Sequence, residues 1–420
     1  MRKVVLAAAI VSLVGCGAAE RHGGTGSGGN GNNGGNGGNG SGGSQGGGGP
    51  SGGPACDQSD QNKDADGDGY TPAQGDCNDC DPSMNPGAIE IGGNGKDDDC
   101  NGQIDDANPA CDSASAGSKD PTEFAHSMEI CDSRFFKGAM TNGPSDPQAR
   151  NVLPKFGILM PKAGANFALL SSGIAVDESG AGYVNPQEGT DLGNTGTNPL
   201  PNLQGATGCG QADQTNVHDY TEIIYTLHAP TNVQSFSFNF QFFSGEYPNY
   251  VCTMYNDEFL AIVESSKTYT TPTNISFDMN MDPITVNSGF FTVCTNDTSK
   301  AQTQHCMYPP SQNQGTGYEM SDDGGIMIPG IPAGIPGGST GWLTTTAPIQ
   351  PGEDITLHFV VFDEGDGVLD SAVLLDNFQW GAATVMGPST GPIGYKMKTI
   401  KHHRPMPVPA LMCLSRDAHT

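Results

Sequence analysis

The chain has 420 residues, of which 61 are glycine and only 15% are charged. Its 46 acidic and 18 basic side chains give a formal net charge of −28. A chain this negative repels nucleic-acid phosphates, so the composition argues against nucleic-acid binding. The same charge suits cation binding or the solvation of an exported surface. The length allows two or more domains.

The N-terminus has the layout of an export signal. Two basic residues precede the apolar run from Val4 to Val14, which is too short to span a bilayer as a helix. The residues from Leu13 to Cys16 resemble the bacterial lipobox, and this resemblance implies a lipid on Cys16 and cleavage before it. We therefore expect residues 1–15 to be a lipoprotein signal peptide. The alternative is an ordinary cleaved signal peptide with a chance cysteine.

Lipidation at Cys16 would attach the protein to a membrane of the cell envelope, because each buried methylene contributes about 0.8 kcal/mol. Gly17 stands where an aspartate would resemble the inner-membrane retention signal, so the sequence favours the outer membrane. Residues 16–54 contain a glycine-rich run without apolar side chains large enough to pack, which predicts a disordered tether. This tether is either a stalk or a tolerated repeat expansion.

Residues 55–112 form an acidic block with fifteen Asp or Glu against two lysines and almost no large apolar residues. Such a segment has no hydrophobic core of its own, so disulfides, bound metal or both must hold it. Cysteines of an exported chain favour disulfides. With Cys16 lipidated, eleven of the twelve cysteines remain and at least one is unpaired, for which Cys413 is the candidate.

Two segments of the acidic block have side-chain oxygens at the spacing of calcium loops. In each, acidic or amide side chains alternate and a glycine follows, so the side chains can converge on one hard cation. The predicted ligands of the first loop are Asp64, Asp66, Asp68, the Tyr70 carbonyl, and Asp76, Asp79 and Asp81 just downstream. Those of the second loop are Asp97, Asp99, Asn101, the Gln103 carbonyl and Asp105.

The two loops depart from the EF-hand, whose twelfth position carries a bidentate glutamate. Gly75 and Asn108 occupy that position here, and no flanking helices are predicted. The arrangement is more similar to the calcium loops of thrombospondin type 3 repeats. The alternative interpretation is an acidic, solvated linker without bound metal.

The run from Asp64 to Asp106 resembles the MopE-type metal-binding motif. The segments that carry the resemblance follow one another in the family's order: Asp64–Tyr70, Gly75–Asp79, Asn85–Glu90, Asn94–Gly102 and Ile104–Asp106. The family label mentions copper, but copper favours His, Met or thiolate ligands and this block has no histidine, so we expect calcium. The resemblance implies a disulfide between Cys77 and Cys100. Cys56 is a candidate partner for the additional Cys80.

Residues 124–383 carry the pattern of an antiparallel β-sandwich. From Phe236 to Phe242, phenylalanines alternate with polar residues, the period of a half-buried strand. Further predicted strands are Phe156–Met160, Phe167–Leu170, Glu222–Leu227, Phe259–Val263, Ile275–Phe277, Phe290–Val293, Ile355–Phe362 and Ala372–Phe378. Many short strands without a long amphipathic helix predict a mainly β, jelly-roll-like fold. We expect a disordered basic tail over residues 384–420.

Four segments of this region resemble the choice-of-anchor L domain of bacterial surface proteins: Phe243–Pro248, Tyr255–Phe259, Phe362–Gly367 and Leu369–Phe378. Family members normally have a C-terminal anchor, whereas Cys16 lies at the other end. Cys209, Cys252, Cys294 and Cys306 are expected to form two disulfides, with Cys294 and Cys306 as a local pair.

Six acids in this region are candidates for a second cation site or a sugar-binding edge: Glu246, Asp257, Asp363, Asp366, Asp370 and Asp376. The alternative is that they are ordinary residues of turns and strand ends.

The leading functional prediction is a non-enzymatic cell-surface lipoprotein. Calcium-stabilised acidic loops would display a β-sandwich that binds a polysaccharide or a surface protein, and the lipid would provide the membrane attachment. The alternative is a secreted, lipid-anchored hydrolase that acts on polysaccharide through two sandwich carboxylates about 5 to 10 Å apart. The sequence contains no HExxH, GxSxG or phosphate-binding glycine motif, which favours the first prediction.

Overall fold

The computed structural model describes residues 56–394, apart from 109–110, 112–113, 144–146, 202, 204–208, 210–215, 295–305 and 320–336. All described residues belong to one compact unit, which begins at Ala55. The predictions for Cys16, the tether, Cys413 and the tail beyond residue 394 lie outside the described residues. Within the described part, no helix is both long and apolar enough to cross a membrane.

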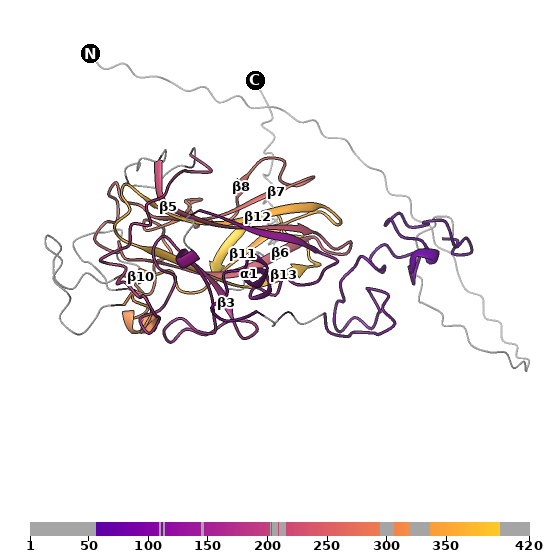
Figure 1. Ribbon diagram of the computed structural model, residues 1–420. Helices are drawn as coiled ribbons and strands as arrows, with labels where there is room; N and C mark the ends of the chain where they lie inside the picture. The colour runs from indigo at the N-terminus through magenta and orange to yellow at the C-terminus, as the bar shows by residue number, and fades with distance from the viewer. Residues whose placement is uncertain are drawn as a thin grey trace, which may run out of the picture. The chain divides into compact units, whose positions relative to one another are not determined.

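Two antiparallel sheets make up the domain that follows the acidic block, and Figure 1 shows β5, β12 and β7 above β11, β6 and β13. The first sheet has the order β1-β5-β12-β7-β8, with β4 beside β5 and β9 beside β7. Its strands are β1 (Phe136–Asn142), β4 (Thr195–Thr197), β5 (Asn216–His228), β7 (Glu258–Ser265), β8 (Thr273–Asn274), β9 (Ile284–Thr285) and β12 (Asp354–Glu364).

The second sheet has the order β14-β11-β6-β13-β3-β2, with β10 beside β6. Its strands are β2 (Arg150–Leu153), β3 (Phe167–Ser171), β6 (Ser235–Ser244), β10 (Gly338–Ser339), β11 (Leu343–Pro348), β13 (Ser371–Gly381) and β14 (Ser389–Pro392). The helical elements are α1 (Pro121–His126) and the 3₁₀ turns η1 (Pro72–Gln74), η2 (Pro147–Ala149) and η4 (Pro310–Asn313). The mainly β, antiparallel fold prediction is confirmed.

Aromatic side chains from both sheets fill the space between them. Phe238 of β6 meets Phe359 of β12 edge to face, with ring centroids 4.8 Å apart, and Phe240 lies 4.9 Å from Phe259 of β7. These rings are fully buried. At about 25 cal/mol per Å² of apolar surface removed from water, burial of these rings stabilises the domain together with the aliphatic side chains of the same core.

Six of the nine predicted strands lie within β3, β5, β6, β7, β12 and β13. The predictions over Phe156–Met160, Ile275–Phe277 and Phe290–Val293 are wrong, since these segments form only isolated bridges or turns. Phe156, Ile275 and Phe291 are nevertheless buried, so these segments contribute to the core from loops, whereas Ile158 and Met160 are exposed. The prediction of a tail without strands from residue 384 is also wrong in part, because β14 pairs with β11 there.

The acidic module, residues 56–108, contains neither a strand nor an α-helix. It nevertheless contacts the sandwich through its apolar residue Ile89, which is buried in the main core cluster. The backbone N–H of Ile89 donates to Asn232 Oδ1 at 3.0 Å, and Asn232 Nδ2 donates to the Ile89 carbonyl at 2.8 Å. The module is thus attached to the sandwich at the turn between β5 and β6.

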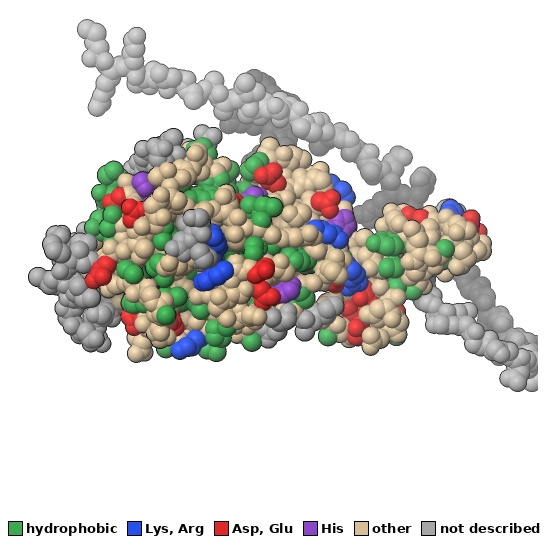
Figure 2. Space-filling model, viewed as in Figure 1, with side chains coloured by type: hydrophobic (Ala, Val, Ile, Leu, Met, Phe, Trp, Pro, Cys, Tyr) green, Lys and Arg blue, Asp and Glu red, His purple; other side chains and the backbone are tan. Residues whose placement is uncertain are grey.

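Figure 2 shows Asp and Glu side chains in small separate groups on the visible face, rather than in one continuous field. One reason is that many acids of the chain are buried, among them Asp76, Asp79, Asp257 and Asp363. Burial of a carboxylate is costly unless it finds a hydrogen-bond donor or a cation. The buried acids are therefore the groups to examine for function.

Candidate metal centre

Asp64 fixes the backbone of the first acidic loop. Its Oδ1 accepts from the N–H of Gly67 at 2.6 Å, and its Oδ2 accepts from the N–H of Gly69 at 3.0 Å. Both glycines have φ values in the left-handed region, 85° and 96°, which other residues rarely adopt. The DxDxDG spacing thus produces a tight loop whose acidic side chains gather on one side.

Five carboxylates meet around Asp66. Ligand oxygens of Asp64, Asp66 and Asp79 lie within 4.8 Å of one another, and so do those of Asp66, Asp68 and Asp76. Asp66 belongs to both groups. The downstream segment that carries Asp76 and Asp79 is held against the loop because Asp79 Oδ1 accepts from the N–H of Ala65 at 2.7 Å. The structure therefore brings together five of the residues predicted for this site.

Three of these acids share one hydrogen-bonding pattern. Asp66, Asp76 and Asp79 each accept one backbone N–H with Oδ1, at 3.2, 2.8 and 2.7 Å respectively. The Oδ2 atom of each is buried and has no hydrogen-bond partner. In metal sites, such second-shell hydrogen bonds orient the ligand and leave the other oxygen for the ion.

Burial in this cluster, with a smaller contribution from neighbouring charges, raises the pKa of three of these acids. Burial, reinforced by the charges of Asp66 and Asp76 and opposed by the N–H of Tyr70, raises the pKa of Asp68 to about 6. Burial and neighbouring acids also raise the pKa of Asp66 and of Asp76. The ionised cluster is therefore destabilised in the absence of a compensating positive charge.

Among the acids predicted for the first loop, only Asp81 stays outside this cluster. Asp81 Oδ2 forms an ion pair with Lys96 Nζ at 2.6 Å, which lowers the pKa of Asp81 despite the opposing effect of burial. Tyr70 donates its backbone N–H to Asp68 Oδ1 at 2.8 Å.

The second loop is arranged differently. Of its predicted ligands, only Asp99 joins a group of close acids, together with Glu90 and Asp106, which the spacing did not indicate. Asp97 instead accepts the N–H groups of Asn101 and Gly102 at 3.0 Å each. The structure does not bring the carboxylates of Asp97 and Asp105 into the group, whereas Asn101 Nδ2 lies 3.4 Å from each carboxylate oxygen of Asp106.

The oxygens of this second group already have partners. Asp99 Oδ2 lies 3.2 Å from Nη1 of Arg134, whose positive charge comes from the sandwich side. Glu90 accepts the N–H of Asp98 and of Asp105 with its two oxygens, at 3.2 Å each. A cation would have to displace these contacts. The cluster around Asp66 is therefore the better candidate metal centre of the two.

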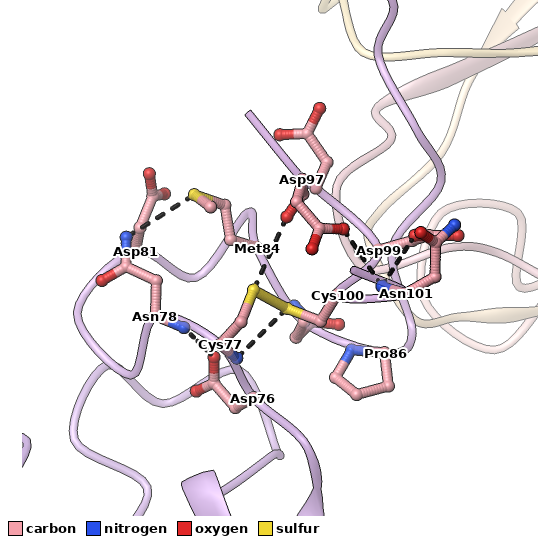
Figure 3. The surroundings of a disulfide bond; sticks show 12 residues. Asp76, Cys77, Asn78, Asp81, Met84, Pro86, Asp97, Asp99, Cys100 and Asn101 are labelled. Atoms are coloured by element: carbon pink, nitrogen blue, oxygen red, sulfur yellow. Dashed lines mark hydrogen bonds between the residues drawn. A yellow bond between two sulfur atoms is a disulfide. The ribbon is translucent and has the colours of Figure 1, made fainter. Parts of the chain in front are cut away.

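Disulfides replace a hydrophobic core in the module. Cys77 is bonded to Cys100, and Figure 3 shows this bond between the segment of Asp76 and the segment of Asp97 to Asn101. Cys56 is bonded to Cys80. A third bond, Cys111 to Cys131, was not anticipated from the sequence. In the sandwich, Cys209 is bonded to Cys252 and Cys294 to Cys306.

The six acids predicted in the sandwich do not form one group. Glu246, Asp257, Asp363 and Asp370 are at most 2% exposed and lie where β6, β7, β12 and β13 begin or end. Asp366 lines a small cavity beside Glu246. Asp376 lies apart from them within β13, where its Oδ2 accepts from the backbone N–H of Lys162.

A larger pocket, of about 420 Å³, lies beside β1 and the end of β13. Half-buried rings of Phe136 and Trp380 line it, together with the polar side chains of Glu129, Asn377 and Gln379. Pockets of this size with apolar walls and a few fixed polar groups are typical ligand sites. Sequence reasoning missed this pocket, because its lining residues come from distant parts of the chain.

Comparison with known families agrees with these two parts of the structure. Residues 76–106 match the MopE-type family described as "Putative metal-binding motif". The match leaves Asp64, Asp66 and Asp68 just outside its N-terminal boundary. Acidic clusters and this motif together indicate a metal-binding module.

Residues 162–379 match the family described as "Choice-of-anchor L domain". Curated proteins and solved structures gave no match. The combination of the two families fits a non-enzymatic protein associated with the cell surface. This match covers more than half of the chain's 420 residues, so the chain belongs to the choice-of-anchor L domain family.

Proposed function

We propose that the acidic module binds calcium at the cluster around Asp66 and that the ion stiffens this module. The observation that carries the proposal is the shared pattern of Asp66, Asp76 and Asp79, each with one oxygen held by a backbone amide and one buried oxygen without a partner. A cation held among these close acids would give such buried oxygens a partner and offset the repulsion between the carboxylates.

The donor set favours calcium over copper. Each of the five clustered acids offers carboxylate oxygen, the ligand that hard cations prefer, whereas copper favours nitrogen and sulfur. Extracellular calcium modules bind with dissociation constants of about 10⁻⁴ to 10⁻³ M. At millimolar calcium this stabilises a site by about 1 kcal/mol, which suits stiffening better than switching.

Calcium titration of a soluble form beginning at Ala55 tests this proposal, with binding followed by calorimetry and folding by circular dichroism. We expect Asp66→Asn to reduce calcium affinity at least tenfold, because Asp66 belongs to both groups of close oxygens. Asp57→Asn is the matched control, since Asp57 is an exposed acid of the same module. The proposal fails if calcium does not bind, or if the two variants lose affinity equally.

We further propose that the protein is a lipid-anchored, non-enzymatic surface protein whose sandwich binds a polysaccharide or a surface protein. The pocket beside Trp380 supports a sugar ligand, because aromatic faces stack on the apolar faces of sugar rings while amides and carboxylates bind their hydroxyls. The lipid on Cys16 would provide the membrane attachment.

A glycan array probed with the same soluble form tests the binding role. Trp380→Ala should abolish binding of any glycan that is retained, whereas Trp342→Ala, which removes an indole outside this pocket, should leave it unchanged. Release of shortened glycans would instead favour a hydrolase. Radiolabelled palmitate in the cells that express the protein should label the wild type and not the Cys16→Ala variant.

A further inference from the structure

One acid of the candidate metal centre, Asp68, accepts a hydrogen bond from a buried amide. Its Oδ2 accepts from Asn85 Nδ2 at 2.9 Å, and its Oδ1 accepts the backbone N–H of Tyr70 at 2.8 Å. Asp68 also belongs to the group of close oxygens with Asp66 and Asp76. The hydrogen-bond partners of a metal ligand fix its orientation, and their loss typically lowers metal affinity about 10- to 100-fold. Asn85 is therefore placed to orient one of the ligands.

Asn85 is 0% exposed and uses every hydrogen-bonding position of its side chain. Its Nδ2 donates to Asp68 and, at 3.3 Å, to the carbonyl of Pro82. Its Oδ1 accepts the N–H of Gly87 at 2.9 Å and the hydroxyl of Thr231 at 2.7 Å. A side-chain amide has two donors at one end and two lone pairs at the other, so these four partners fix how the side chain lies. Asn85 thus joins a candidate metal ligand to Thr231.

Thr231 belongs to the sandwich, in the turn between β5 and β6. Besides its hydroxyl, its backbone N–H crosses to the module and donates to the carbonyl of Gly87 at 3.0 Å. A Cβ added to Gly87 would lie 2.4 Å from the hydroxyl of Tyr70, so Tyr70 packs closely against this glycine. The two residues that hold Asp68 therefore both meet the contact with the sandwich, Asn85 directly and Tyr70 through Gly87.

A cavity of about 540 Å³ lies beside this contact. Asp68 and Ser83 line it from the module, and Thr231 and Lys267 line it from the sandwich. Because open space separates the walls of a cavity, hydrogen bonds rather than packing connect Asp68 to the sandwich on this side. Such bonds depend on the position of both partners, since a shift leaves buried polar groups unpaired.

The ion and the sandwich thus act on the same carboxylate. In the ionised, metal-free cluster, Asp68 is repelled by Asp66 and Asp76, whereas a cation would hold the three together. The sandwich holds Asp68 in this position through Asn85, which lowers the cost of assembling the site. If attachment favours calcium in this way, calcium must favour attachment by the same factor.

We propose that Asn85 is a positioning residue that couples calcium binding in the acidic module to the attachment of the module to the sandwich. The inference rests on the proposed calcium site and extends its effect from the module to the junction. Calcium then stiffens the joint that carries the sandwich as well as the module itself.

Removal of the Thr231 hydroxyl tests this coupling from the sandwich side. Thr231→Val keeps the shape of the side chain and the backbone bond to Gly87, and it removes the donor to Asn85. Calorimetry on the full chain should show roughly fivefold weaker calcium binding, the lower end of the range for coupled sites. Thr231→Ser, which restores the hydroxyl, should bind calcium as the wild type does. Thr273→Val is the matched control, because the Thr273 hydroxyl donates to the carbonyl of Thr271 instead.

The outcomes separate this inference from the proposed calcium site. Equal calcium affinity in Thr231→Val and the wild type would overturn the coupling and leave the calcium site intact. Equal weakening in Thr273→Val would also overturn the coupling, since the effect would not be specific to the junction. A wild type that binds no calcium would contradict the calcium site and this inference together.

Hydrogen exchange at the junction measures the reciprocal effect. The N–H groups of Thr231 and Ile89 cross between the two parts, the first to the carbonyl of Gly87 and the second to Asn232 Oδ1. Saturating calcium should slow their exchange several-fold in the wild type and less in Thr231→Val. Calcium that binds without slowing these two amides would overturn the proposal, because the ion would then stiffen the module alone.

Discussion

Asp376 is a buried acid of the sandwich that lies outside the candidate metal centre. On β13 it follows the inward-facing Leu375, so its side chain points away from the main core. Its Oδ2 accepts from the backbone N–H of Lys162 and of Ala163, and its Oδ1 has no partner. Burial, opposed by these amides and by the charge of Lys162, raises the pKa of Asp376 to about 6.

This shift predicts how Asp376→Asn changes stability with pH. A folded-state pKa above the unfolded value means that the folded chain holds the proton more tightly, so its stability falls as pH rises from about 4 to about 6. We expect Asp376→Asn to increase the free energy of unfolding by on the order of 2 kcal/mol at pH 7.5 and by little at pH 4. Urea denaturation at the two pH values measures this. Equal changes in the free energy of unfolding at the two pH values would contradict this prediction.

Among the strands, β6 is the one whose sequence most clearly determines its structure. Alternation predicts an inward row of phenylalanines, and the structure places that row against β7 and β12. Neither β11 nor β14 has such a pattern: β11 contains three successive threonines, and β14 contains glycine and proline. These strands form because β6 offers β11 an edge to pair with, and β11 offers one to β14. Local sequence does not encode that kind of pairing.

The candidate metal centre shows the same limit. The alternating acids Asp64, Asp66 and Asp68 could be predicted from spacing, because one tight loop brings them together. The second group of close acids could not be predicted from spacing, since Glu90 and Asp106 meet Asp99 only when the chain folds back on itself. The neutralisation of Asp99 by Arg134 likewise depends on contact with another part of the chain.

The core strands predict a large effect for Phe238→Ala. The ring is fully buried and contacts both Phe240 and Phe359. We expect a loss of about 3 to 5 kcal/mol in the free energy of unfolding, from lost transfer energy and the cavity left behind. Phe277→Ala is the control, because Phe277 is only half-buried, and it should cost clearly less. Chemical denaturation measures both.

The Cys77–Cys100 bond should matter for calcium as well as for stability. It spans 23 residues, for which chain entropy predicts about 3 kcal/mol of stabilisation. Because it holds the segment of Asp76 in place, we expect Cys77→Ser/Cys100→Ser to lower calcium affinity at least tenfold. Calorimetry on the oxidised proteins measures this. Unchanged affinity would show that the loop alone forms the metal centre.

At the scale of the whole molecule, Asn232 and Arg134 make polar contacts that attach the acidic module to the sandwich, beside the packing of Ile89 and the hydrogen bonds of Thr231. Asn232 exchanges two hydrogen bonds with the backbone of Ile89, and Arg134 binds Asp99 and the carbonyl of Ala88. Since the module has no core of its own, its folded state should depend on these contacts. The sandwich, with its aromatic layer, should not depend on the module to the same degree.

This asymmetry predicts the effect of Asn232→Ala/Arg134→Ala on thermal unfolding. In the wild type we expect the module and the sandwich to unfold together. In the variant, buried groups of Ile89 and Asp99 lose their partners, so the module should unfold first in a separate transition. Calcium should raise the temperature of that first transition, because the ion binds the folded module. Differential scanning calorimetry with calcium and with chelator measures both effects. A single transition in the variant, moved equally by calcium, would mean that other contacts unite the two parts.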